Sequence, residues 1–276
     1  MMKISIVTVA FNEEKNMART IESVLNQTSI DIEYIICDGK STDETVEIAN
    51  TYKEKFAAKG IKYIVNSEKD SGIYDGMNKG IDIATGDYIF FLNAGDWFYS
   101  DDTIEKVINV AKENGCPDFI YGDIMRFERG VISPVYASDE FLRERMSVLH
   151  PGLFSTTEIM KRNPFELKYS IAADYDFVLN QKLQGKDFLK IDAIISFFAA
   201  DGVSSQNFIA AEKESEMIRK SYGLPVSSKI TKKYIYKMQL DIIIKSWLPQ
   251  KLWELWSVKV KGKRLYSSVI KAFDVR

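Results

Sequence analysis

The stretch that decides the fold lies near the start of the chain and reads Lys3-Ile4-Ser5-Ile6-Val7-Thr8-Val9-Ala10-Phe11-Asn12-Glu13. Residues 3–9 are mostly apolar and rich in β-branched side chains, which is typical of a strand buried on both faces of a parallel sheet. Residues 13–26 follow with Met17, Ile21, Val24 and Leu25 at helical spacing. The beginning of the chain therefore predicts a strand, a polar loop and an amphipathic helix.

The same alternation of apolar runs and helical spacing continues along the chain. Such a βαβ rhythm predicts an α/β fold with an open, mainly parallel central sheet that is flanked by helices on both faces. We expect further strands at residues 32–37, 61–65, 87–92 and 119–121, and helices at residues 44–56, 72–84 and 101–114.

Composition excludes several classes of protein. The chain has 276 residues, 46% of them hydrophobic, which is enough for a sizeable core, and its net charge of −2 argues against nucleic acid as a partner. Cys37 and Cys116 are too few for a disulfide scaffold and fit a reducing compartment. The sequence contains no run of 18 uncharged apolar residues, so it predicts no membrane span. We expect a cytoplasmic location.

The charge is distributed unevenly along the chain. Residues 229–276 hold 12 basic and three acidic residues, a net charge of +9, whereas residues 1–228 carry −11. The basic segment also contains Trp247, Trp253 and Trp256. Cationic, Trp-bearing amphipathic segments suit an anionic membrane surface, here the inner face of the cell membrane. The same distribution of charged and apolar residues also fits a helical subdomain that packs on residues 1–228. It equally fits a dimerisation element, so an oligomer is possible.

Polar and acidic residues follow four of the predicted strands. Ligands of open α/β sheets bind beyond the carboxyl ends of the strands, where these loops meet. A loop carboxylate there can bond a ribose or a base, or hold a divalent cation that bridges a diphosphate, although each loop Asp can equally form a turn. No Gly-x-Gly-x-x-Gly follows the first strand, which disfavours a dinucleotide site. The loops are residues 10–13, 38–43, 68–72 and 93–96.

Six segments, in order and at the expected intervals, resemble those of family 2 glycosyltransferases, which have the GT-A fold. The ordered set carries the resemblance, which covers roughly the first 205 residues. It is most similar to a subgroup that acts in bacterial polysaccharide assembly of the colanic-acid type. The segments are Val7–Glu13, Ser23–Thr28, Cys37–Thr45, Glu68–Gly80, Ala84–Ile89 and Leu92–Asp96.

The resemblance implies a nucleotide-sugar donor, most often a UDP-sugar. Asp38 is expected to bond the base or the ribose, and Gly39 stands where the family often has a second acid. The choice among UDP, dTDP and GDP therefore stays open. The other donor-binding residues implied are Thr8, Phe11, Asn12 and Glu13 at the nucleoside, Asp75, Asn78 and Lys79 facing the donor, and Asn93 and Gly95.

The resemblance also implies a divalent cation, Mg²⁺ or Mn²⁺. The metal motif of the family corresponds to Asn93-Ala94-Gly95-Asp96, in which only Asp96 is a carboxylate. Mg²⁺ keeps several waters in proteins, so one carboxylate together with diphosphate oxygens can hold it. We expect the metal at Asp96 and weak metal affinity without nucleotide.

The second half is expected to supply the acceptor site and the base. An inverting transfer is a single in-line displacement that needs a general base for the acceptor hydroxyl. Residues 171–177 resemble the acidic acceptor-side motif of the family, with Asp174 as the base and Asp176 in reserve. Asp174 could also cap the helix expected at 175–183, and the two roles are compatible. The remaining residues implied are His150 at the diphosphate or acceptor, and Asp201, Gly202 and Ser204 in a loop near the donor.

The expected protein is an inverting, metal-dependent glycosyltransferase that acts on a glycan or lipid-linked acceptor in bacterial surface polysaccharide synthesis. Two alternatives are a non-catalytic nucleotide-sugar-binding or scaffold protein, and a sugar-nucleotide pyrophosphorylase, which would need a Gly-rich basic loop after the first strand. We expect a GT-A domain at residues 1–210, with a nucleotide-sugar half at 1–100 and an acceptor half at 101–210. A helical, basic amphipathic extension is expected at 211–276.

Overall fold

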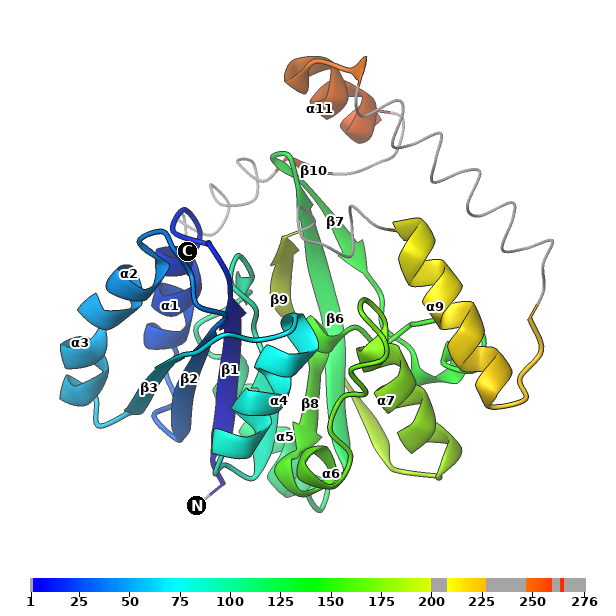
Figure 1. Ribbon diagram of the computed structural model, residues 1–276, viewed down its shortest axis with the longest axis horizontal. Helices are drawn as coiled ribbons and strands as arrows, with labels where there is room; N and C mark the ends of the chain where they lie inside the picture. The colour runs from blue at the N-terminus through cyan, green and yellow to red at the C-terminus, as the bar shows by residue number, and fades with distance from the viewer. Residues whose placement is uncertain (1, 200–207, 227–246, 260–263, 266–276) are drawn as a thin grey trace.

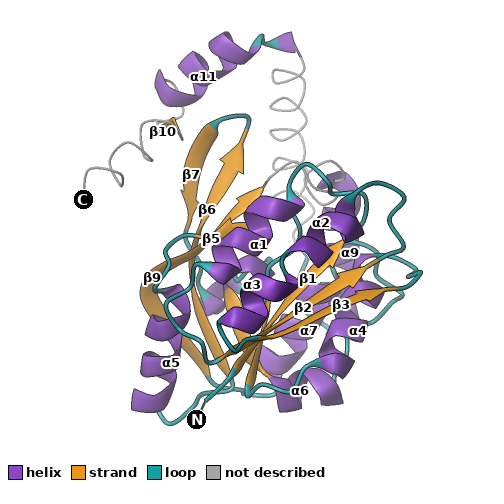
Figure 2. Ribbon diagram, turned by 90° about the vertical axis from the view of Figure 1, so that its left-hand side faces the viewer, coloured by secondary structure: helices purple, strands orange, loops and turns teal. Residues whose placement is uncertain are grey.

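The computed structural model describes residues 2–199, 208–226, 247–259 and 264–265. Within these residues a ten-stranded mixed sheet runs through the molecule, with helices on both faces (Figure 1, Figure 2). The predicted α/β class with a central sheet flanked by helices is confirmed. The division into two halves and a C-terminal extension stays a prediction.

The first half of the chain forms the parallel part of the sheet, in the strand order β4-β1-β2-β3. Because these strands are parallel, their carboxyl ends lie at one edge of the sheet. The elements are β1 (Ile4–Ala10), α1 (Met17–Leu25), β2 (Ile32–Asp38), α2 (Thr45–Thr51), α3 (Lys53–Ala58), β3 (Lys62–Ser67), α4 (Ile73–Ile83), β4 (Tyr88–Phe91), β5 (Trp97–Phe98) and α5 (Thr103–Glu113).

The second half extends the sheet with mixed strand directions. β8 pairs antiparallel with β4, β6 pairs antiparallel with β8 and β7, and β9 runs parallel to β6 and antiparallel to β5. The elements are β6 (Phe119–Glu128), β7 (Val131–Val135), η1 (Asp139–Phe141), η2 (His150–Gly152), β8 (Leu153–Thr156), α6 (Thr157–Arg162), α7 (Ala173–Leu183), β9 (Phe188–Ala199), α9 (Phe208–Ser221), α11 (Gln250–Lys259) and β10 (Arg264–Leu265).

The core consists of two large apolar layers, one on each face of the sheet, and a smaller cluster of Trp97, Met125, Ile132 and Phe197. One face packs against α1, α2, α3 and α5, and the other against α4, α6, α7 and α9. α4 lies very close to β1, since an added Cβ at Gly80 would stand 2.3 Å from Val7 Cγ1, and one at Gly76 2.7 Å from Val9 Cγ1. The two glycines thus set the position of α4, whose first turn reaches the carboxyl edge of the sheet.

Two elements differ from their predicted extents. The single helix expected at residues 44–56 is interrupted at Tyr52 and forms α2 and α3. The carbonyl of Ala49, which would continue the helix, accepts a hydrogen bond from the Tyr63 hydroxyl at 2.8 Å and one from Tyr52 N at 3.3 Å. The short strand expected at 119–121 continues to Glu128, because β9 and β7 pair with its second part.

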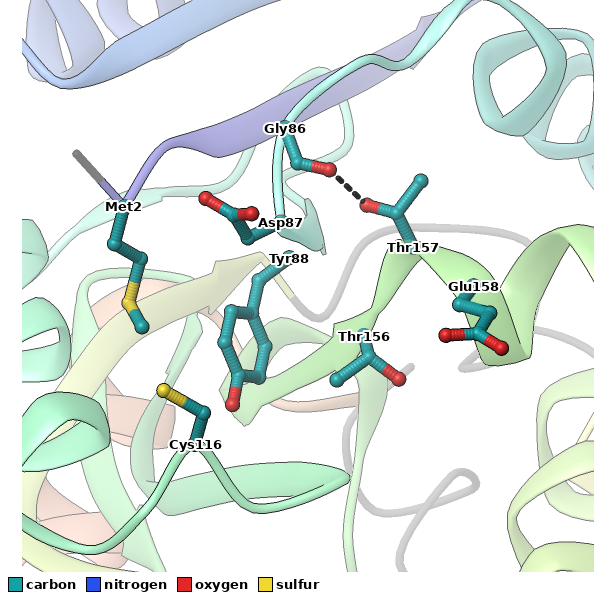
Figure 3. A pocket seen from close by; sticks show the side chains of 8 residues that line it. All are labelled: Met2, Gly86, Asp87, Tyr88, Cys116, Thr156, Thr157 and Glu158. Atoms are coloured by element: carbon teal, nitrogen blue, oxygen red, sulfur yellow. Dashed lines mark hydrogen bonds between the residues drawn. The ribbon is translucent and has the colours of Figure 1, made fainter.

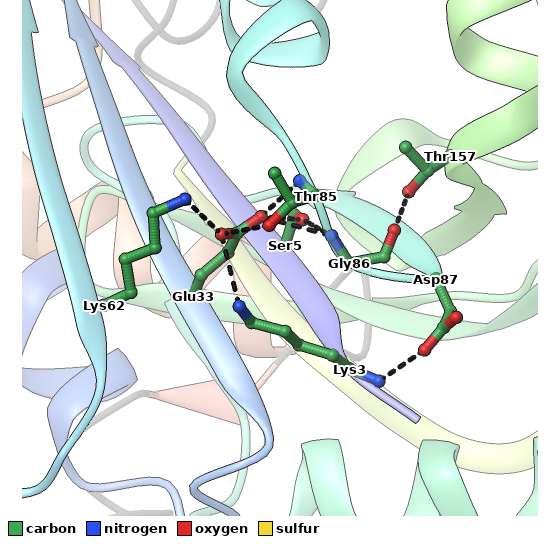
Figure 4. Close-up of polar contacts among 8 residues, drawn as sticks. All are labelled: Lys3, Ser5, Glu33, Lys62, Thr85, Gly86, Asp87 and Thr157. Carbon is green, nitrogen blue, oxygen red and sulfur yellow. Dashed lines mark hydrogen bonds and ion pairs between the residues drawn. The ribbon is translucent and has the colours of Figure 1, made fainter. Parts of the chain in front are cut away.

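A buried carboxylate ties the amino-terminal ends of the parallel strands together (Figure 4). The Glu33 side chain of β2 is fully buried and accepts hydrogen bonds from Ser5 Oγ at 2.7 Å and from Thr85 N and Oγ1 at 2.5 and 2.8 Å. Lys3 and Lys62 lie 3.4 and 3.1 Å from Glu33 Oε2. Burial alone would raise the pKa of Glu33, but these hydrogen bonds outweigh it and lower the pKa to about 2.

None of the helices in the described ranges is long and apolar enough to span a membrane.

Candidate active site

The loop after β2 is held by Asp38 at the carboxyl edge of the sheet. Asp38 is buried, and its Oδ2 accepts hydrogen bonds from Lys40 N at 3.1 Å, Ser41 N at 3.0 Å and Ser67 Oγ at 2.6 Å. Its Oδ1 accepts from the Ser41 hydroxyl. The carboxylate predicted to bond the base or ribose therefore fixes the shape of the loop that borders the nucleoside position.

A second carboxylate, Asp70, occupies the space beside Gly39. A Cβ added at Gly39 would stand 2.6 Å from Asp70 Oδ2, so no side chain fits at Gly39 while Asp70 is there. Asp70 Oδ1 accepts from Gly72 N at 3.1 Å, and burial raises the pKa of Asp70. Asp70 was not predicted as a site residue. The sequence signal for Asp70 is Gly39, which stands where the family often has a second acid. The Asp70 carboxylate, from the next loop, occupies the space that a side chain at position 39 would fill.

The loop after β1 is bonded to the loop after β2. Asn12, at φ +54°, donates from its backbone N–H to Ser41 Oγ at 2.8 Å and accepts at Oδ1 from Thr42 N at 2.9 Å. Glu13 N donates to Thr45 Oγ1 at 2.7 Å. The Phe11 side chain lies in the loop after β1, and 60% of the residue is exposed, so that a flat base can stack on its ring.

Thr8 lies away from this surface. Its side chain is fully buried, and its hydroxyl lies 3.0 Å from the Tyr34 hydroxyl and donates to the Leu92 carbonyl at 2.6 Å. Thr8 therefore joins β1 to the strands beside it, and its expected place at the nucleoside stays a prediction.

The three residues of α4 that were predicted to face the nucleotide-sugar donor form hydrogen bonds with neighbouring loops. Asp75 accepts at Oδ2 from Ser71 N at 2.8 Å. Asn78 exchanges two hydrogen bonds of 2.9 Å with the backbone of Phe165. Lys79 lies 3.1 Å from Glu68 Oε1 and donates to the Lys69 carbonyl at 2.7 Å. The sugar-facing role expected of these residues stays a prediction.

The loop after β4 carries Asp96, which is almost fully buried. Its Oδ1 accepts from Ala199 N, at the end of β9, at 2.8 Å. Burial raises the pKa of Asp96 to about 7. Gly95, at φ +100°, donates from its N–H to Thr20 Oγ1 at 3.0 Å, and its carbonyl accepts from Arg19 at 2.8 Å. The Arg19 guanidinium in turn stacks on the Trp97 ring, 3.8 Å from the ring centre. α1 thus shapes the loop around Asp96.

Oxygen atoms at this loop fit a hard divalent cation. Asn93 Oδ1 is buried and has no hydrogen-bond partner among the described residues, and the same loop carries the Asp96 carboxylate, whose pKa burial raises to about 7. No cluster of three or more His, Cys, Asp or Glu suited to a metal occurs in the described part of the chain. Asn93 and Asp96 could therefore supply two oxygens, with diphosphate oxygens and water as the other ligands.

A chain of polar side chains leads from this loop to α7. Asn93 Nδ2 lies 3.0 Å from His150 Nε2, and His150 Nδ1 lies 3.2 Å from Asp174 Oδ2. The Tyr74 hydroxyl of α4 lies 2.9 Å from Asp174 Oδ1, which also accepts from Tyr175 N at 3.0 Å. The structure therefore brings together Asn93, His150 and Asp174, which are far apart in sequence. Tyr74 was not predicted as a site residue.

Asp176 does not join this chain. Two residues along a helix correspond to a rotation of about 200°, so Asp176 points away from Asp174. It lines a separate cavity of about 640 Å³ with Lys168, Tyr169 and Tyr222, and burial raises its pKa. Of the predicted site residues, Asp201, Gly202 and Ser204 lie outside the described residues.

Another pocket, of about 560 Å³, lies at the opposite edge of the sheet (Figure 3). Met2, Asp87 and Tyr88 line it at the amino-terminal ends of β1 and β4, and Thr157 Oγ1 donates there to the Gly86 carbonyl at 2.6 Å. It contains none of the residues of the His150–Asp174 chain. The chemistry-bearing side chains are therefore those of the carboxyl edge.

The mixed sheet with helices on both faces matches the structures of GT-A-type glycosyltransferases. The chain belongs to glycosyl transferase family 2, whose family model matches residues 5–166. It is therefore a glycosyltransferase, and the recognition made from the sequence is confirmed.

Curated relatives of the chain are named as glycosyltransferases. The chain is 34% identical over 175 residues to a PGL/p-HBAD biosynthesis glycosyltransferase of Mycobacterium tuberculosis, which covers 63% of this chain and 67% of the relative. It is 30% identical over 195 residues to a poly(ribitol-phosphate) beta-glucosyltransferase of Bacillus spizizenii, over 67% of this chain and 30% of that protein.

Solved structures share the fold. S. aureus TarS 1–349 in complex with UDP-GlcNAc has a TM-score of 0.64 and 16% identity over 83% of this chain and 69% of that one. The mannosyltransferase PcManGT from Pyrobaculum calidifontis, in complex with GDP-Man and Mn²⁺, has a TM-score of 0.61 and 12% identity over 86% of this chain and 68% of that one.

Proposed function

We propose that this glycosyltransferase transfers a sugar with inversion from a UDP-sugar to a hydroxyl group of a cell-surface glycan or its lipid-linked precursor. The observation that carries the proposal is the chain Asn93–His150–Asp174, which joins the metal-motif loop to a carboxylate at the acceptor side. The relatives named for PGL/p-HBAD biosynthesis and as a poly(ribitol-phosphate) beta-glucosyltransferase support the acceptor class.

Asp70 narrows the choice of base, and the choice of uridine within it rests on TarS. An ionised carboxylate accepts hydrogen bonds and donates none, so it favours a base edge with a ring N–H, which uracil, thymine and guanine present and cytosine does not. Asp70 Oδ2 stands over Gly39, beside the loop that Asp38 holds. The exposed ring of Phe11 offers a stacking face near it. TarS, which shares the fold, was solved with UDP-GlcNAc.

The transfer itself needs one base and no covalent intermediate. The proton of the acceptor hydroxyl moves to the Asp174 carboxylate as the acceptor oxygen bonds C1 of the sugar. The bond between C1 and the diphosphate oxygen breaks, and its electron pair leaves with UDP. His150 and Tyr74 hold the two oxygens of Asp174 in one orientation, which reduces the entropic cost of reaching the reactive geometry.

A divalent cation is part of this proposal. Asp96 and Asn93 would hold it, and it would neutralise charge that develops on the diphosphate. The Mn²⁺ in the PcManGT structure supports a divalent cation in this fold. Arg19 positions the Gly95 carbonyl and so the loop that carries both ligands.

Thermal unfolding tests the donor and the metal together. UDP, GDP, dTDP and CDP are each added with and without Mn²⁺, and a ligand that binds the folded state raises the midpoint. We expect the largest shift with UDP and Mn²⁺, and its loss in Asp96→Asn, which keeps the acceptor for Ala199 N. Asp101→Asn, at an exposed position, is the matched control.

Two results would contradict the proposal. If the unfolding midpoint rises equally with and without Mn²⁺, Asp96 does not hold a metal. If UDP raises the midpoint but no sugar is transferred, the protein is a non-catalytic nucleotide-sugar-binding protein.

We also propose that α11 brings the enzyme to an anionic membrane surface, where a lipid-linked acceptor is found. Leu252 and Leu255 are 50% and 51% exposed, and Trp247 just before α11 is 85% exposed. The opposite side of α11 packs on the body, because Trp253 is fully buried and Gln250 bonds the Arg129 carbonyl at 2.7 Å. The net charge of +9 on residues 229–276 complements an anionic surface.

A further inference from the structure

The turn that leads into α7, just before Asp174, is bound by a side chain from another helix. The N–H groups of residues 170–172 come before the first residue of α7 and have no acceptor within that helix. Glu214 of α9 supplies the acceptors. Its Oε1 accepts from Ser170 N at 3.0 Å and Ser170 Oγ at 2.7 Å, and its Oε2 accepts from Ile171 N at 2.9 Å and Ala172 N at 3.0 Å.

The same turn is held from the other side by α4. The Tyr74 hydroxyl lies 2.7 Å from the Ile171 carbonyl and 2.9 Å from Asp174 Oδ1, so its single proton serves one of these acceptors at a time. Ile171 thus has its N–H bound by Glu214 and its carbonyl beside Tyr74. The backbone three residues before Asp174 is fixed between two helices.

α9 is itself firmly attached to the body. Ile218 is fully buried in the apolar core that α7 also fills, and the Arg219 guanidinium, with 4% of its side chain exposed, lies over the Tyr175 ring of α7, 6.0 Å from the ring centre. Burial raises the pKa of Glu214, but the hydrogen bonds from residues 170–172 outweigh it and lower the pKa, so that Glu214 is a carboxylate at neutral pH. A rigid, charged acceptor therefore meets the start of α7.

We infer that α9, which lies beyond the family-model match at residues 5–166, completes the acceptor side of the enzyme, and that Glu214 is a positioning residue for Asp174. This inference rests on the proposed role of Asp174 as the base. Glu214 bonds the backbone before Asp174 and touches neither Asp174 nor the donor loops, so it acts on the orientation of the base and leaves nucleotide binding unchanged.

The test is Glu214→Gln in the full chain. An amide has only one acceptor oxygen and no charge. With its NH₂ group in place of Oε1, the Ser170 hydroxyl can accept from it, but Ser170 N loses its acceptor, and the hydrogen bonds that remain are no longer made to a charged group. The assay measures UDP release from whichever of UDP-glucose, UDP-galactose and UDP-GlcNAc the wild type uses fastest. We expect kcat to fall about 10- to 100-fold, the range for a small displacement of a catalytic group. The KM for that UDP-sugar and the affinity for UDP should stay within about twofold.

Two further variants make the result specific. Glu216→Gln, two residues along α9, removes only an exterior ion pair with Lys220 at 2.8 Å and should keep the wild-type kcat. Glu214→Asp keeps the charge with a shorter reach and should recover part of the loss. If Glu214→Gln does not fold, Glu214→Asp carries the test, with a kcat between those of the wild type and Asp174→Asn.

A wild-type kcat in a folded Glu214 variant, or equal losses of kcat and UDP affinity, would overturn the inference. Asp174→Asn separates this failure from that of the proposed function. If Asp174→Asn keeps the wild-type rate, the base assignment is wrong whatever Glu214 does. If Asp174→Asn is inactive and Glu214→Gln is fully active, only the positioning role is wrong.

Discussion

At the scale of single residues, the candidate base is held at both of its oxygens. Asp174 Oδ2 meets His150 Nδ1 at 3.2 Å, and Oδ1 meets the Tyr74 hydroxyl at 2.9 Å. A carboxylate that rotates freely would spend little of its time aligned with the acceptor hydroxyl. The two partners therefore matter for the rate of transfer and little for donor binding.

Tyr74→Phe removes the hydroxyl and leaves the ring, which packs on Phe165 with ring centres 5.4 Å apart. A hydrogen bond to a charged group contributes about 1.5–3 kcal/mol, so we expect kcat to fall about 10-fold or more. UDP affinity should not change. Steady-state kinetics of UDP release measure the effect, with Tyr136→Phe, at a 75% exposed position, as the control. An unchanged kcat would show that the hydroxyl does not orient Asp174.

The sequence predicted the residues of the hydrogen-bonded chain Asn93–His150–Asp174 better than the residues that surround them. His150, Asn93 and Asp174 were expected at the site, and the structure places them in one hydrogen-bonded chain. Tyr74 and Asp70 were missed, because their roles depend on how closely α4 approaches β1 and on the space left at Gly39. Tyr74 leaves no mark in the local sequence pattern, whereas the glycine at position 39, where the family often has an acid, is the one signal for Asp70.

At the scale of elements, Glu33 of β2 joins the amino-terminal ends of β1 and β4, opposite the candidate site. In the folded protein its pKa is lowered to about 2 from an ordinary value of 4.5. Such a carboxylate contributes stability that is fully present above pH 4.5 and is lost as the pH falls from there toward 2.

Glu33→Gln should therefore lower the free energy of unfolding by about 2–3 kcal/mol at pH 7, with a smaller difference from wild type near pH 3. Urea unfolding at both pH values measures this difference. The exposed Glu47→Gln is the control and should change stability by less than about 0.5 kcal/mol. A constant difference at the two pH values would mean that Glu33 is not ionised in the folded protein.

Element prediction succeeded where apolar spacing alone sets the structure. The parallel strands and α1, α4 and α5 follow from periodicity, because each buries a face against the sheet. The division of α2 from α3 depends on the contact between Tyr63 and the Ala49 carbonyl, which is long-range. The second part of β6 depends on pairing with β9, where the partners of Asp123 and Met125, Ile194 and Phe197, lie 71 and 72 positions later in the chain.

At the scale of the whole molecule, an acidic body carries a basic segment whose described helix exposes apolar side chains. We expect the protein to float with vesicles of phosphatidylglycerol and phosphatidylcholine at low salt. Replacing Leu252, Leu255 and Trp247 by Ser should reduce the bound fraction several-fold without lowering UDP affinity. Met217→Ser, a 60% exposed apolar position on α9, is the control. Equal flotation of the triple variant and the wild type would exclude α11 as the membrane contact.

One comparison tests the central claim most directly, namely the rates of UDP release by the wild type, Asp174→Asn and Asp176→Asn. Both aspartates lie in the first turn of α7, but only Asp174 meets His150. We predict a rate at least about 100-fold lower for Asp174→Asn, with unchanged UDP affinity, and a rate within about threefold of wild type for Asp176→Asn. A fully active Asp174→Asn, or equal losses in both variants, would contradict the account.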